Sequence, residues 1–109
     1  LIRMDVLTRK GAEEGYGIAA PAPLDWECVK WCFETAADMR SPLIIATMPG
    51  KNTGMSAEEL AAAVKYYEKK YPQVPAGFVW DHGRSYEEAA RAILTGFTGV
   101  MVGQVRFVR

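Results

Sequence analysis

The stretch SPLIIAT, residues 41–47, contains a continuous apolar run without alternation between polar and apolar residues. Such a run predicts a strand that is covered on both faces, which is typical of parallel sheets. Three other short apolar segments, YGIAA (16–20), VPAGFVW (74–80) and TGVMVG (98–103), share this character. The sequence therefore predicts four strands, and the segments between them decide how the strands are connected.

Helical segments separate the predicted strands. Segment 21–40 starts with loop prolines and then places Val29, Phe33, Ala36 and Ala37 on one apolar stripe. This spacing predicts a helix with one buried face. Because parallel strands need a long crossover between them, helices of this length indicate right-handed parallel connections.

Two later helices have recognisable start signals. Ser56 and Glu59 have the spacing of a capping box, in which each side chain bonds the backbone N–H of the other residue, and Ser85 and Glu88 repeat it. Pro72 is expected to stop the first of these helices. The expected apolar faces are Leu60, Val64, Tyr67 and Tyr71 in the first helix, and Ala89, Ala92 and Ile93 in the second.

A shorter helix over residues 4–15, ended by Gly15, precedes the first strand. The whole chain, 1–109, then reads as one α/β domain with four β/α units. It fits either an open doubly wound sheet or the first half of a (β/α)8 barrel. A complete barrel has about 250 residues. An open sheet of this length could stand alone, whereas a half-barrel would leave its edge strands exposed.

Composition excludes several classes of protein. Thirteen basic and thirteen acidic side chains cancel, so no basic field indicates nucleic-acid binding. The apolar runs are far shorter than the ~20 residues of a membrane helix.

Cys28 and Cys32 lie four apart on one helix face, where we expect them to pack as small apolar groups rather than pair. A reducing cytoplasm fits this cysteine usage best.

In both architectures function gathers at the carboxyl ends of the strands. Asp81 and His82 follow the third predicted strand, before Gly83, which we expect to let the backbone turn sharply. Imidazole is the commonest protein ligand of zinc, and a carboxylate can act as a general acid or base. The alternative interpretation is a capping aspartate beside a surface histidine, because one histidine supplies only one of several zinc ligands.

The sequence around this pair resembles the metal-dependent class II ketose-bisphosphate aldolases. Members of that family carry a strand ending in DHG, a helix that begins at a serine, and then AI..GFTSVMID. Here DHG (81–83), Ser85, AI (92–93) and GFTGVMV (96–102) follow in the same order. Upstream, YGIAAPAPLDWECVKWCFETAADMRSPLIIATMPG is similar to the family segment YAVGAFNVNNLEW...AILEAAEEEKSPVILQVSEG. The resemblance covers nearly the whole chain.

The resemblance implies a (β/α)8 barrel of which this chain is the first half. It implies that Asp81 is the catalytic acid/base and that His82 is a ligand of a catalytic zinc whose remaining ligands lie outside the chain. Zinc would polarise the carbonyl of a ketose (bis)phosphate, and Asp81 would exchange a proton with the hydroxyl of the aldehyde partner during aldol cleavage or condensation. The implied partners are a sugar-phosphate substrate, and other copies of the chain or a C-terminal half.

Three strand ends depart from the family pattern. APAP (20–23) replaces an F-N-x-N loop, MPG (48–50) replaces SEG, and GQV (103–105) replaces DGS or DAS. Each change removes a polar group that would hold a sugar phosphate, and losing one such buried hydrogen bond costs ~1–3 kcal/mol. The alternative function is therefore a non-catalytic half-barrel that acts as an oligomeric or interaction module.

The loop KNTG (51–54) lies just before the helix that Ser56 starts. Lys51 and backbone N–H groups could hold an anion at that helix N-terminus, and Thr47 or Asn52 could replace the missing serine. Lys51 and Asn52 are therefore candidate substrate-binding residues, with an ordinary polar loop as the alternative. A small flavodoxin-like binding domain is the last alternative, but no phosphate-binding glycine pattern follows the first strand.

Overall fold

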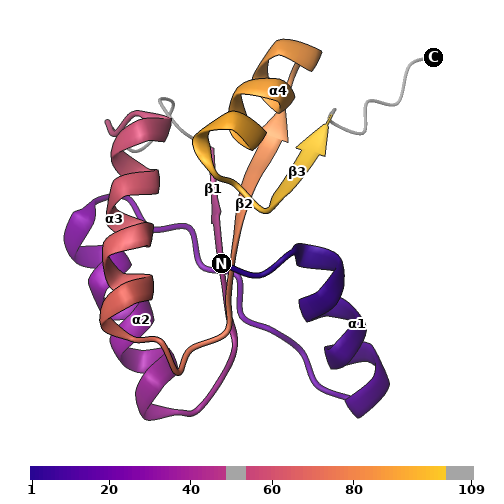
Figure 1. Cartoon of the computed structure of the whole chain (residues 1–109), viewed down its shortest axis with the longest axis vertical. Helices are drawn as coiled ribbons and strands as arrows, with labels where there is room; N and C mark the ends of the chain where they lie inside the picture. Colours follow the sequence, from indigo (N-terminus) through magenta and orange to yellow (C-terminus); the bar gives the residue numbers. More distant parts are fainter. Residues whose placement is uncertain (49–53, 103–109) are drawn as a thin grey trace.

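The computed structural model of the chain describes residues 1–48 and 54–102. Its elements, in chain order, are α1 (Met4–Glu14), α2 (Trp26–Asp38), β1 (Leu43–Thr47), α3 (Ala57–Lys70), β2 (Ala76–Gly83), α4 (Tyr86–Thr95) and β3 (Gly99–Val102) (Figure 1). The strands pair in the order β1-β2-β3, and both pairings are parallel. The predicted α/β fold with a parallel sheet is thus confirmed, with three strands in the described ranges.

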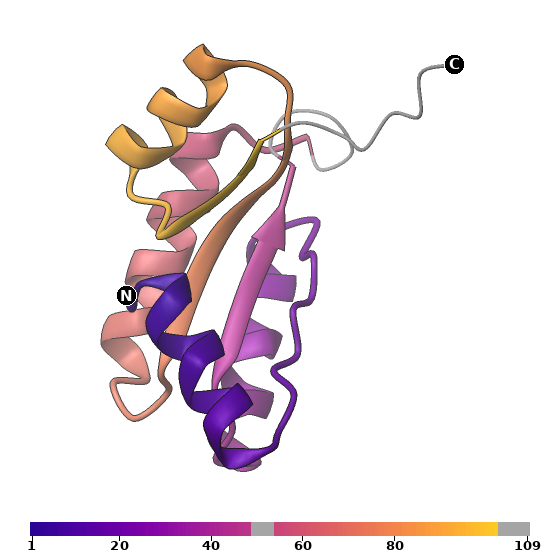
Figure 2. The ribbon, with the colours of Figure 1, turned by 90° about the vertical axis from the view of Figure 1, so that its right-hand side faces the viewer.

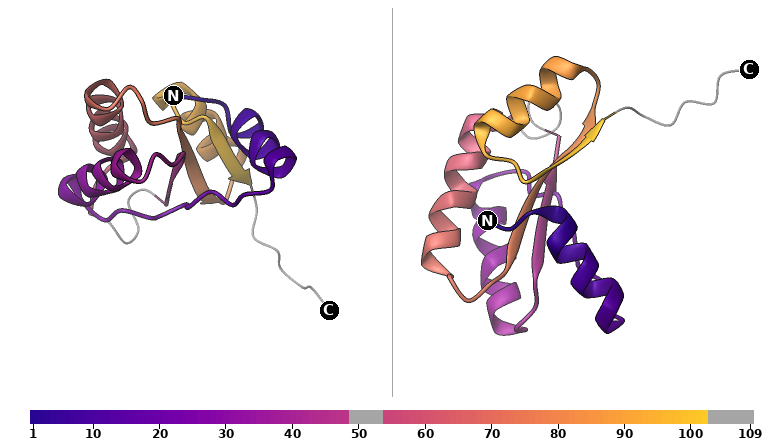
Figure 3. Two further views of the ribbon diagram at one scale, coloured as in Figure 1. Left: turned by 90° about the horizontal axis from the view of Figure 1, so that it is seen from below. Right: turned by 45° about the vertical axis from the view of Figure 1, so that its right-hand side comes forward.

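The two faces of the sheet are covered differently. Helices α2 and α3 lie on one side of the sheet, and α1 lies on the other (Figure 3). Ala76, Phe78 and Trp80 of β2 belong to the main apolar core on the side of α2, α3 and α4. Because side chains alternate along a strand, Gly77 faces the other side, where a Cβ would lie 2.9 Å from side-chain atoms of α1.

The buried faces of the helices follow the predicted stripes with one exception. Val29 and Phe33 of α2 are fully buried, and so is Val64 of α3. In α4 Ala92 is fully buried, but Ile93 is 66% exposed, so the prediction for Ile93 was wrong. The main contacts of helix α4 with the other described elements are with β3, β2 and α3, and Ile93 lies largely outside them.

Capping explains where α3 and α4 begin. The Ser56 hydroxyl accepts from the backbone N–H of Glu59, and the Glu59 carboxylate accepts from that of Ser56, which confirms the first capping box. Ser85 also accepts from the backbone N–H of Glu88, at 3.1 Å. The Glu88 carboxylate instead accepts from Arg84, from its backbone N–H at 2.8 Å and from its guanidinium at 3.1 Å. The second predicted box is therefore half formed, because Arg84 offers the stronger, charged donor.

The first predicted strand, YGIAA, is not formed. The segment runs as coil beside β1 (Figure 2), and the backbone N–H groups of Ile44 and Ala46 donate to the carbonyls of Ala19 and Pro21 at 3.1 and 3.0 Å. In a parallel ladder, residues 21 and 23 would donate back to the carbonyls of β1. Pro21 and Pro23 have no N–H, so the segment is hydrogen-bonded in one direction only.

Within the described residues, none of the helices has the length and apolar composition needed to cross a membrane. Cys28 and Cys32 are both free and partly buried, which confirms that they do not pair with each other.

Candidate active site

The parallel pairing brings the carboxyl ends of β1, β2 and β3 to one edge of the sheet. Asp81 and His82 lie at this edge, within the last three residues of β2. Ala76, Phe78 and Trp80, which precede them in β2, are buried in the apolar core. The strand thus holds Asp81 and His82 at the end of a rigid support, the position in which α/β folds place reactive side chains.

Strand β2 contains one extra residue at this edge. Trp80 of β2 pairs with Val100 of β3, and the next pair consists of Gly83 and Val102. Three steps along β2 therefore match two steps along β3, so β2 forms a one-residue bulge. β-bulges are over-represented next to active sites, where they redirect a side chain.

The bulge brings two neighbouring side chains to the same place. By the alternation of the strand, Asp81 lies on the face of Gly77 and Val79, opposite the core that holds Trp80. His82 would normally point the other way. Its φ of 55° is in the left-handed region, and its Nε2 atom lies 3.6 Å from Oδ2 of Asp81.

Both side chains can be reached by a solute. The side chain of His82 is 46% exposed and that of Asp81 is 30% exposed. The nearby Arg84 does not neutralise Asp81, because its guanidinium binds Glu88, and bonds from Arg84 lower the pKa of the Glu88 carboxyl. Among the described residues, His82 is the one basic side chain that lies within 4.0 Å of the Asp81 carboxylate. The pair can therefore combine a proton-exchanging carboxylate with an imidazole that is free to bind a metal.

Gly83 serves a purpose different from the predicted one. It is part of β2 and its φ is not positive, so the prediction of a sharp glycine turn was wrong, and His82 makes the turn instead. A Cβ on Gly83 would lie 2.7 Å from the carbonyl oxygen of Met101. Glycine is required here because the backbones of β2 and β3 approach too closely for any side chain.

The other sequence candidates do not join this pair in the described chain. Thr47 pairs with Trp80, is 1% exposed and shares its face of the sheet, so its hydroxyl points into the core rather than toward Asp81. Lys51 and Asn52 lie outside the described residues, as does the segment 103–105. No three His, Cys, Asp or Glu side chains gather into a metal site within the part of the chain that is described. His82 fits a zinc ligand by its donor type and by the exposure of its side chain.

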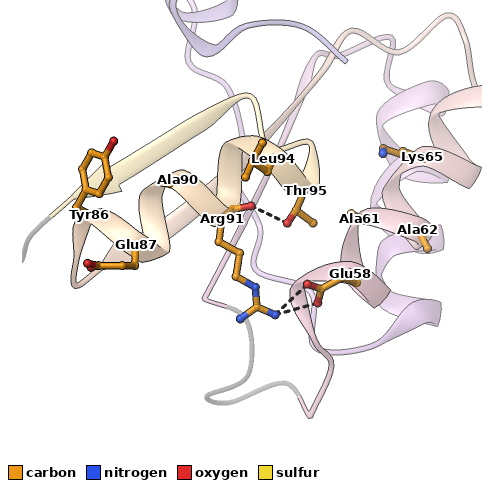
Figure 4. A pocket seen from close by; sticks show the side chains of 10 residues that line it. All are labelled: Glu58, Ala61, Ala62, Lys65, Tyr86, Glu87, Ala90, Arg91, Leu94 and Thr95. Carbon is orange, nitrogen blue, oxygen red and sulfur yellow. Dashed lines mark hydrogen bonds and ion pairs between the residues drawn. The ribbon is translucent and has the colours of Figure 1, made fainter.

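A groove lies between α3 and α4, on the outer side of these helices (Figure 4). An ion pair between Glu58 and Arg91, 2.9 Å long, crosses the groove, and Leu94 stands on its rim with 87% of its surface exposed. Neither Asp81 nor His82 lines it. The groove is therefore distinct from the candidate active site.

Enzymes with parallel α/β sheets place their reactive side chains at the carboxyl edge of the sheet, where this chain holds an aspartate and a histidine. The family model of fructose-bisphosphate aldolase class-II matches residues 2–104, so the chain belongs to this family. The resemblance inferred from the DHG and GFTGVM motifs is confirmed.

Individual relatives agree with the family model. A fructose-bisphosphate aldolase of Helicobacter pylori is 31% identical over 102 residues, which are 94% of this chain and 33% of the relative. One from Thermus caldophilus is 34% identical over 98 residues, 88% of this chain and 31% of the relative. The chain thus spans about a third of the length of these curated relatives.

The fold has a counterpart among solved structures. The crystal structure of the YdjI aldolase from Escherichia coli K12 superposes with a TM-score of 0.82 at 25% sequence identity. The match covers 92% of this chain and 39% of that one. The fold described above is therefore similar to part of an aldolase.

Proposed function

We propose that these residues are the first half of a class II aldolase barrel that cleaves or condenses a ketose (bis)phosphate. Asp81 is the acid/base of the reaction, and His82 is a ligand of a catalytic zinc. The observation that carries this proposal is the 3.6 Å approach of the two side chains at the carboxyl edge of a parallel sheet, in a chain of this family.

Asp81 suits the proton transfer by its chemistry and its place. In the cleavage direction its carboxylate accepts the proton of the substrate hydroxyl that lies β to the ketose carbonyl. The neighbouring C–C bond then breaks, its electron pair passes to the carbonyl, and the new aldehyde leaves. In condensation Asp81 returns the proton to the aldehyde oxygen, and the C–C bond forms.

His82 would hold zinc through an imidazole nitrogen, and zinc, when bound, would polarise the ketose carbonyl as a Lewis acid. Catalytic zinc sites commonly use three protein ligands. We place the ligands other than His82 outside the described residues. The length of the relatives, about three times that of this chain, supports that placement.

The half-barrel belongs to the same proposal. The coil at residues 17–23 accepts hydrogen bonds from Ile44 and Ala46, and takes the place of a first barrel strand beside β1. On the opposite side, Val102 of β3 is 62% exposed and Ile93 of α4 is 66% exposed. These exposed apolar side chains would be covered by the β/α units that follow in a complete barrel.

A second candidate function is a non-catalytic half-barrel that associates with other copies of itself. Two features favour it: Thr47 points into the core, and the loop APAP (20–23) has no asparagine where the family resemblance implies one that contacts substrate. This alternative predicts an oligomer in solution and no metal-dependent turnover.

The test is aldol cleavage by the full-length protein, measured with and without zinc after chelation. Asp81→Ala should lower kcat by about 10²–10⁴-fold, the usual contribution of a general acid or base. His82→Ala should weaken zinc binding. Asp38→Ala is the matched control, because Asp38 is an exposed carboxylate at the end of α2, away from the carboxyl edge.

Unchanged activity in Asp81→Ala would contradict the role of Asp81. Absence of turnover with every divalent metal, together with a stable oligomer, would favour the second function.

A further inference from the structure

The carboxyl end of β2 is fixed on both sides of its bulge. Trp80 pairs with Val100 before the extra residue, and Gly83 pairs with Val102 after it. Strand β2 must therefore accommodate one extra residue between these two fixed pairs. His82 absorbs it by adopting a φ of 55°.

This conformation is not the one that His82 would prefer. For residues with a Cβ, a left-handed backbone is unfavourable, because the Cβ atom lies too close to the following carbonyl oxygen. A regular strand would relieve that strain, and it would also return His82 to the face of Trp80, away from Asp81. Something in the structure has to hold β2 in the bulged arrangement.

Gly83 is the residue that allows the bulged arrangement of β2. A Cβ at this position would lie 2.7 Å from the carbonyl oxygen of Met101, closer than real Cβ atoms come. At Gly77 and Gly99 the closest obstacles are flexible side chains of α1, such as Met4, which could move aside. At Gly83 the obstacle is the backbone of β3, which cannot rotate away.

We propose that Gly83 is a positioning residue: by letting β2 rejoin β3 immediately after His82, it holds the bulge that turns the His82 imidazole toward Asp81. The geometric part of this inference stands on the pairing of the strands. Its consequence for zinc binding rests on the function proposed above.

The chain offers a clean probe, because His82 is its only histidine. Its imidazole proton signals in an NMR spectrum are therefore unique, and a nuclear Overhauser effect to the β-protons of Asp81 reports their proximity. The three-bond coupling and the chemical shifts of the His82 backbone report the sign of φ. Neither readout depends on activity or on a bound metal.

The experiment compares Gly83→Ala with Gly17→Ala in the 109-residue chain. Gly17 is the matched control, because a Cβ there meets nothing within 4 Å and its φ is not positive. We expect Gly17→Ala to keep the Overhauser effect and the positive φ of His82, and Gly83→Ala to lose both. A folded Gly83→Ala variant that keeps both would overturn the inference.

If Gly83→Ala does not fold, a deletion of His82 decides the question. Removing the extra residue removes the bulge, so the close approach to Met101 should disappear and alanine should become tolerable. We expect the deletion variant with Gly83→Ala to show the same cooperative thermal unfolding as the deletion alone. Failure of this double variant to fold, while the deletion alone folds, would overturn the inference.

Zinc titration of the full-length protein separates this inference from the proposed function. We expect Gly83→Ala to weaken zinc binding at least tenfold. If the Overhauser effect is lost while zinc affinity and kcat stay unchanged, Gly83 positions His82 as inferred, and the metal role proposed for His82 is wrong.

Discussion

Nε2 of His82 lies 3.6 Å from Oδ2 of Asp81, although the two residues are neighbours on a strand. Neighbours on a regular strand point to opposite faces of the sheet. The approach depends on the left-handed backbone of His82, which the strand adopts where β2 has one residue more than β3. The geometry of the candidate site is therefore a property of the backbone as much as of the two side chains.

Substitutions of His82 should reveal the left-handed backbone in the stability of the chain. Glycine adopts a positive φ without strain, whereas a β-branched residue resists it. We expect His82→Gly to be at least as stable as the native chain, and His82→Val to lose about 1–2 kcal/mol. Urea unfolding, followed by circular dichroism, measures both.

Val79 supplies the control for this prediction, because it lies in the regular part of the same strand. There glycine should destabilise, by about 0.5–1 kcal/mol from backbone entropy and by more from lost packing. Valine should therefore give the more stable chain at position 79, and glycine the more stable chain at position 82. The same order at both positions would show that His82 does not hold a left-handed conformation in solution.

The sequence predicted the helices and the three paired strands well, because their signals are local. Capping serines, the apolar stripe of α2 and the uninterrupted run in β1 each depend on a few neighbouring residues. The prediction of the first strand, YGIAA, was wrong because a β-ladder also depends on which backbone N–H groups can donate across it. Pro21 and Pro23 face β1 without an N–H, a fact that becomes informative only once the register is known.

The candidate pair was predicted by its residue types and its place after an apolar run, but its geometry was not. No local pattern indicates that β2 has one residue more than β3, since the paired residues Trp80 and Val100 are twenty positions apart in the sequence. The reason for Gly83 also depends on a distant residue, Met101. Distances between strands decided these features, and a single sequence does not contain them.

Restoring the missing donors should complete the pairing of the first segment with β1. In Pro21→Ala and Pro23→Ala, new backbone N–H groups would face the carbonyls of Ile44 and Ala46. We expect amide hydrogen exchange at residues 21 and 23 to be slowed at least tenfold, relative to the same residues in the unfolded chain. A net hydrogen bond contributes about 0.5–1.5 kcal/mol, and the loss of proline rigidity offsets about 0.4–1 kcal/mol, so overall stability should change little.

The amide of Ala22 provides the comparison within the same variant, because an alternating segment turns it away from β1. It should exchange faster than residues 21 and 23. Equal exchange at all three positions would show that this segment does not lie in register with β1.

Cys32 should react more slowly with alkylating reagents than an exposed thiol. Burial, and then the neighbouring Cys28, raise the pKa of Cys32 above its ordinary value of 9.0, so less thiolate is present at neutral pH. The pH at which its alkylation rate reaches half-maximum, measured by mass spectrometry, should lie above 9.0 and should fall in Cys28→Ser.

The same shift fixes the sign of a pH effect on stability. Because the folded chain holds the Cys32 proton more tightly than the unfolded chain, this contribution is present below the ordinary pKa and is lost as the pH rises through the raised one. Cys32→Ser should remove that loss at alkaline pH. A midpoint of the alkylation rate at or below pH 9.0 would contradict the raised pKa of Cys32.

Thr47 should be replaceable by valine with a gain in stability. Its Oγ1 atom is buried and has no hydrogen-bond partner among the described residues, and the side chain faces the core beside Trp80. A buried hydroxyl without a partner costs about 1–3 kcal/mol, and valine has nearly the same shape. We expect Thr47→Val to raise the free energy of unfolding by about 1 kcal/mol, measured by urea unfolding, and to leave the kcat of the proposed aldol cleavage unchanged in the full-length protein. Thr47→Ala is the matched control, since it also removes the hydroxyl but leaves a cavity and should destabilise. If Thr47→Val lowers kcat, the hydroxyl serves the reaction, and the conclusion that Thr47 faces away from the site is wrong.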